Sequence, residues 1–63
     1  MEMTEKDKEL IARAKALHWS EWHIVGDMEK QADTEEARAI LHDIRRNNAV
    51  KEKNSADYFS LYE

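Results

Sequence analysis

The chain has 63 residues, no cysteine, no proline, a single glycine and a formal net charge of −4. A chain of this length forms one small domain, and the lack of cysteine excludes a disulfide framework. The acidic balance disfavours binding to nucleic acid or an anionic membrane, and no apolar run is long enough to span a bilayer.

The near absence of proline and glycine predicts an all-α fold, because these two residues disfavour helix most strongly. We expect the first helix over residues 4–18. Thr4 and Asp7 have approximately the spacing of a capping box, and Asp7 is the only polar residue on the apolar face. The apolar residues of that face recur at helical spacing: Met3, Leu10, Ile11, Ala14 and Leu17.

The second helix is expected over residues 20–32, with Ser20 as its N-cap. The sequence leaves a second architecture open, in which one helix over residues 4–32 forms a hairpin with the next helix and dimerises into a four-helix bundle. Ile24 and Val25 precede Gly26, so a short strand over residues 22–25 is a lesser alternative. The preferred architecture is a three-helix domain.

The third helix is expected over residues 34–48. Asp33 is the predicted N-cap with Glu36 at the N3 position, and Asn47 and Asn48 are a plausible left-handed stop. Residues 51–55 are charged and polar, which is typical of a linker. This pattern divides the chain into a helical domain over residues 1–50 and a linker with an aromatic tail over residues 51–63.

The tail carries three of the five aromatic residues of the chain. Disordered tails are usually poor in aromatic residues, so we expect this one to dock on the domain or on a neighbouring subunit. A core built from so few residues is marginal without a disulfide or metal, which predicts a homo-oligomer, most simply a dimer.

We expect a non-enzymatic protein–protein interaction module, a small adaptor or regulator. Trp19 and Trp22 lie on neighbouring parts of a helical face, and tryptophan is enriched at interaction hot spots. The expected partner-binding residues are these two tryptophans and the large apolar residues of the tail: Trp19, Trp22, Tyr58, Phe59, Leu61 and Tyr62.

The alternative function is a nucleic-acid-binding regulator. It would use a basic stripe on the third helix: Arg38, His42, Arg45 and Arg46. Such a stripe can contact phosphates, although the same arginines also stabilise the end of a helix by interacting with its dipole.

No constellation of residues indicates catalysis, so we expect no enzyme activity and no cofactor. The three histidines lack the inward carboxylates that would complete a metal site, so no metal is expected either. The charged start of the chain does not resemble a targeting segment, which makes the cytoplasm the expected compartment, with another protein as partner and no membrane association.

Overall fold

A computed structural model describes the backbone of residues 2–60 and the side chains of residues 2–54. These residues form three α-helices, one short 3-10 helix and no strand. The elements are α1 (Glu5–Ala16), η1 (Trp19–Glu21), α2 (Trp22–Gln31) and α3 (Glu35–Ser60). The all-α prediction is confirmed, whereas the strand considered for residues 22–25 is wrong because this segment begins α2.

Helix α1 begins with the capping box expected from the sequence. The backbone N–H of Asp7 donates to Thr4 Oγ1 over 3.1 Å, and the backbone N–H of Thr4 donates to the Asp7 carboxylate over 3.4 Å. Two of the backbone donors that a helix start leaves without partners are satisfied in this way. Local sequence therefore determines where α1 begins.

The chain leaves the helical conformation at Leu17 and His18, which are both extended. The single helix over residues 4–32 is therefore wrong, and the three-helix architecture is confirmed. The cap at this break is His18 rather than the expected Ser20: the His18 ring nitrogen Nδ1 accepts from the backbone N–H of Ser20 over 3.2 Å. A side-chain acceptor at this position satisfies a donor that the break leaves free.

Helix α3 differs from the prediction at both ends. Thr34 caps its start instead of Asp33, since Thr34 Oγ1 accepts from the backbone N–H of Ala37 over 3.3 Å. The helix does not stop at Asn47 and Asn48 but continues through residues 51–55 to Ser60. Asparagine inside a helix costs only a few tenths of a kcal/mol, and none of the described non-glycine residues has a positive φ.

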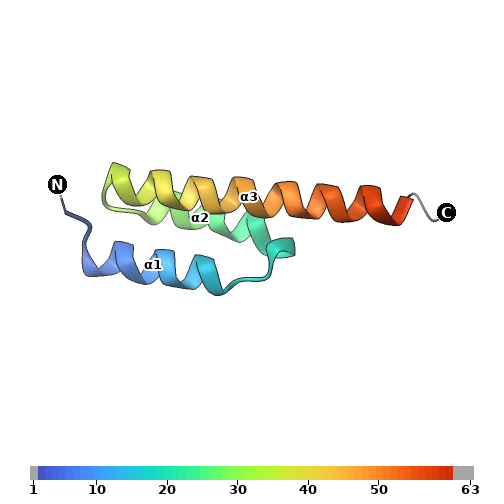
Figure 1. The fold of residues 1–63 in the computed structure, drawn as a ribbon. Helices are drawn as coiled ribbons and strands as arrows, with labels where there is room; N and C mark the ends of the chain where they lie inside the picture. Colours follow the sequence, from blue (N-terminus) through green and yellow to red (C-terminus); the bar gives the residue numbers. More distant parts are fainter. Residues whose placement is uncertain (1, 61–63) are drawn as a thin grey trace.

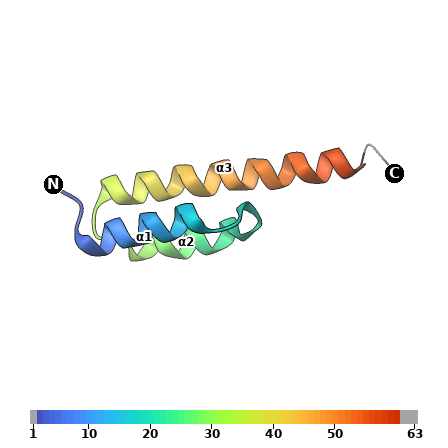
Figure 2. The same ribbon diagram turned by 60° about the horizontal axis from the view of Figure 1, so that its bottom comes forward.

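The core lies between the three helices, which run along a common direction (Figures 1 and 2). Helices α2 and α3 form a tight hairpin, and α1 packs against both. The buried apolar side chains are Leu10, Ile11, Ala14, Val25, Met28, Ala32, Ala37 and Leu41. The C-terminal part of α3 extends beyond the ends of α1 and α2 (Figure 1), and the Cα atoms span 49 × 16 × 14 Å along the principal axes.

One carboxylate is buried at the end of the bundle where α1 begins and where α2 is connected to α3. Asp7 is fully buried, and its carboxylate accepts from the backbone N–H of Asp33 over 2.7 Å and from Thr34 Oγ1 over 2.8 Å. Burial alone would raise the pKa of Asp7, but hydrogen bonds from Asp33, Thr34 and Thr4 favour the charged form and hold the pKa below its usual value. The one polar residue on the face of α1 therefore connects α1 to the start of α3.

None of the helices among the described residues combines the length and apolar character needed to cross a membrane.

Candidate functional site

A groove of about 390 Å³ opens between α1 and α3 near the break after α1. Its apolar surface comes from Ala14, Leu17, Trp19 and Ile44. Ala14 is buried, whereas the other three are only half-buried and so keep apolar surface available. The remaining lining residues are polar or basic: Lys15, His18, Asn47, Asn48 and Lys51.

Trp19 is held at the edge of this groove by the 3-10 helix. The ring of His18 lies against the indole with 4.7 Å between ring centroids, and the same His18 ring caps η1 through Ser20. The His18 ring, itself fixed by its bond to Ser20, therefore restricts the indole of Trp19 without burying it. A restricted, half-exposed tryptophan is well suited to binding, because little side-chain entropy is lost when a partner covers it.

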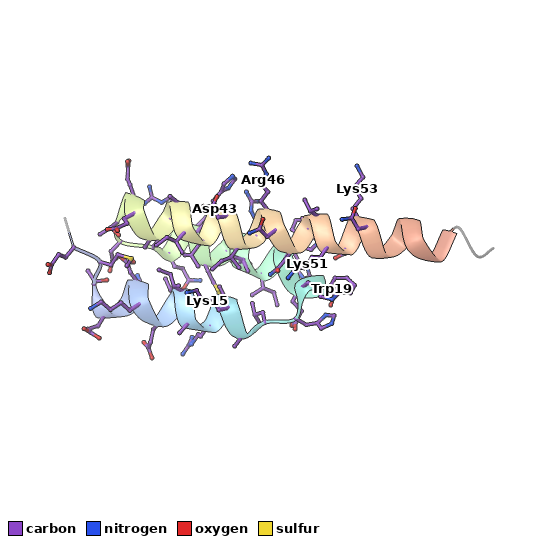
Figure 3. The ribbon with its side chains drawn as sticks, in the orientation of Figure 1. Lys15, Trp19, Asp43, Arg46, Lys51 and Lys53 are labelled. Carbon is purple, nitrogen blue, oxygen red and sulfur yellow. The ribbon has the colours of Figure 1, made fainter. Side chains whose placement is uncertain are left out.

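The rim of the groove is basic. Lys15 and Lys51 are exposed, and Figure 3 shows them with Trp19 on the side of α3 that faces α1, whereas Arg46 and Lys53 project from the other side. Within the described part of the chain, no carboxylate lines the groove. The rim of the groove is therefore locally positive, although the chain as a whole has a net charge of −4.

The two tryptophans do not act as a pair on one helix. Trp22 is the first residue of α2, and its indole N–H donates to the carboxylate of Glu52 over 2.8 Å. This bond joins the start of α2 to the part of α3 that we expected to be a linker. Trp22 therefore makes a contact between two helices, and of the two tryptophans only Trp19 lines the groove.

The expected basic stripe on α3 is partly neutralised by α2. Glu29, whose side chain is only 13% exposed, lies 3.1 Å from the ring of His42 and 3.4 Å from Arg45 Nε. Arg38 donates to the carbonyl oxygen of Ala32 over 3.4 Å. The carboxylate of Glu29 reduces the positive charge that His42 and Arg45 could offer to phosphate groups, whereas the bond of Arg38 to a neutral carbonyl leaves the charge of Arg38 unchanged.

A second, open groove of about 740 Å³ lies over α2 and α3 on the side of this stripe. Its charged lining is mixed: Glu29, Lys30, Glu35, Arg38, His42 and Asp43. Because acidic and basic groups alternate here, the surface does not select a ligand of one sign. Of the two grooves, only the one between α1 and α3 combines apolar surface with one sign of charge.

Four of the expected partner-binding residues cannot be placed at either groove. The side chains of Tyr58, Phe59, Leu61 and Tyr62 lie outside the described residues, although α3 includes the backbone of the first two. Whether the tail docks therefore stays a prediction. The sequence did not indicate Lys15, Leu17 or Ile44 as binding residues, because they line the groove only once α1 and α3 are packed together.

The described residues contain no group of three or more histidine, aspartate or glutamate side chains positioned to hold a metal ion. Comparison of the chain with protein-family models, with curated protein sequences and with solved structures finds no match.

Proposed function

We propose that the chain is a non-enzymatic protein–protein interaction module, an adaptor or regulator whose binding site is the groove between α1 and α3. One observation carries the proposal: a half-buried tryptophan and aliphatic side chains are bordered by two lysines, with no described carboxylate in the lining. We also propose that the chain acts in the cytoplasm and self-associates, both as expected from its sequence.

The partner expected for this groove is a peptide segment with a large apolar residue and neighbouring carboxylates. The apolar residue would cover Trp19, Leu17 and Ile44, and the burial of that surface would supply most of the affinity. Carboxylates on either side would pair with Lys15 and Lys51. Such charged contacts at the rim mainly set specificity and the rate of association.

Two synthetic peptides with the same leucine and phenylalanine residues test this, one flanked by glutamates and the other by lysines. The readout is a ¹H–¹⁵N NMR titration, in which the indole N–H groups of Trp19 and Trp22 give separate signals. We expect the acidic peptide to shift the Trp19 signal and the backbone signals of residues 14–19 and 44–51, and to leave the Trp22 indole signal in place.

The matched variants are Lys15→Glu with Lys51→Glu at the rim, and Lys53→Glu on the other side of α3 (Figure 3). The rim variant should weaken binding of the acidic peptide by about tenfold, and Lys53→Glu should leave it within about twofold. Equal binding of both peptides, or shifts confined to the α2–α3 side, would contradict the proposal. Salt-dependent binding to duplex DNA that Arg38→Glu abolishes would support the nucleic-acid alternative instead.

A further inference from the structure

We infer that the occupant of the α1–α3 groove is a second copy of this chain, with residues 56–63 of each copy lying in the groove of the other. The inference rests on the proposed binding role of the groove and names its partner. It makes the protein a symmetric dimer with two equivalent contacts, the commonest arrangement of homo-oligomers.

The chemistry of residues 56–63 matches the groove. This stretch contains four large apolar residues, Tyr58, Phe59, Leu61 and Tyr62. Its only charged side chains are those of Asp57 and Glu63. The groove offers the complement, with Trp19, Leu17 and Ile44 for apolar groups and two lysines for carboxylates.

The course of α3 favours the groove of another copy over the groove of the same copy. Lys51 lines the groove, and α3 continues from it as a helix to Ser60, beyond the ends of α1 and α2 (Figure 1). At 1.5 Å per residue, Ser60 lies about 13 Å further along the axis than Lys51. The backbone of α3 therefore leads away from the groove of its own chain as far as Ser60, and an antiparallel second copy would bring residues 56–63 of one chain to the groove of the other.

The amount of apolar surface also fits a dimer. Three of the eight core side chains are alanines, so the isolated bundle buries little apolar surface for its length. An aromatic side chain buries about 150–250 Å², so two tails would bury on the order of 1,000 Å² from their aromatic residues alone. With the surface they cover, this reaches the range of about 1,200–2,000 Å² that is usual for stable interfaces.

Charge exchange between two full-length variants tests the inference. One chain carries Lys15→Glu and Lys51→Glu in the groove, and the other carries Asp57→Lys and Glu63→Lys in the tail. The wild-type chain should be a dimer by light scattering at micromolar concentration. In each variant alone, like charges would face each other, so the dimer dissociation constant should rise by about tenfold or more.

An equimolar mixture of the two variants should restore the dimer, since each groove then meets a tail of opposite charge. Lys53→Glu is the control and should stay dimeric, and far-UV circular dichroism establishes that every variant is helical. A monomeric wild-type chain, or two helical variants that dimerise like wild type or fail to pair when mixed, would overturn the inference. If the wild-type monomer still binds the glutamate-flanked peptide at Trp19, the proposed binding role of the groove stands, whereas the second copy in the groove and the proposed self-association are excluded.

Discussion

The carboxylate of Asp7 accepts a hydrogen bond of 2.7 Å from the backbone N–H of Asp33, which joins the first turn of α1 to the connection before α3. The side chain of Asp33 returns the contact, because it accepts from Thr4 Oγ1 over 2.9 Å and lies 3.5 Å from Lys6 Nζ. Hydrogen bonds and an ion pair, from both main chain and side chains, thereby connect the start of α1 to the residues just before α3. A group of mutually bonded polar residues of this kind specifies how α1 is placed on the hairpin.

Replacing Asp7 by asparagine should destabilise the fold strongly. The asparagine side chain has an NH₂ donor in place of one carboxylate oxygen, whereas Thr4, Asp33 and Thr34 all donate to this position. At least one of these hydrogen bonds is therefore lost. We expect the melting temperature to fall by on the order of 10 °C. Glu9→Gln is the matched control, because Glu9 is exposed on the same helix, and it should melt within about 2 °C of wild type. Equal melting of the two variants would show that the buried carboxylate contributes nothing.

Stability should fall in acid, and Asp7 should account for part of the fall. Its pKa in the folded state lies below the ordinary value of 3.8, so the folded state binds the proton less readily than the unfolded state. This stabilisation is fully present above pH 3.8 and is lost as the pH falls through the lower, folded-state pKa. Urea unfolding at a series of pH values between about 2 and 6 should show a smaller acid dependence for Asp7→Asn than for wild type.

Gly26→Ala should stabilise the protein. A Cβ added at Gly26 would lie 3.6 Å from Arg45 Cδ, an ordinary contact with a flexible side chain, and the glycine has no positive φ to preserve. The gain should approach 1 kcal/mol in the free energy of unfolding measured with urea, roughly the difference in helix propensity. Ala12→Gly at an exposed position of α1 should cost about the same amount. A destabilised Gly26→Ala variant would mean that Arg45 cannot move aside.

Glu52→Ala should release the indole of Trp22 and loosen α3 beyond Asn48. The variant removes the acceptor of the 2.8 Å hydrogen bond, at a cost of about 1 kcal/mol in unfolding free energy. In NMR spectra we expect a shift of the Trp22 indole signal and faster amide exchange in residues 49–54. Glu52→Gln keeps an acceptor oxygen and should change both much less. Slow exchange that persists in Glu52→Ala would show that α3 does not depend on this contact.

Features set by neighbouring residues were predictable from the sequence, and features set by distant residues were not. The cap of α1 was predicted because Thr4 and Asp7 are three residues apart. The partners of Asp7 in the loop before α3 were not, because Asp33 follows it by 26 residues and only the folded bundle brings them together. The predicted end of α3 was wrong for the same reason. Asn47 and Asn48 indicated a helix end, but the helix continues past them to Glu52, whose carboxylate accepts a hydrogen bond from the distant Trp22 indole.

The candidate site was predicted in part. Trp19 was identified because of its residue type, and the structure places it half-exposed at the edge of a groove; its role in binding stays a prediction. The basic rim was not foreseen, since Lys15 and Lys51 belong to different helices and become neighbours of one groove only after α1 packs on α3. The role of Glu29 was missed as well, because a residue of α2 reaches His42 and Arg45 on α3.

The length of α3 also affects how the molecule moves through solvent. The Cα atoms span 49 Å along one axis but only 16 and 14 Å along the other two, so the molecule is elongated and experiences more friction than a sphere of the same volume. A single 7.5 kDa chain should therefore diffuse more slowly, and leave a sizing column earlier, than a globular protein of that mass. Rotation should be unequal too, slower end over end than about the long axis along which all three helices run (Figures 1 and 2).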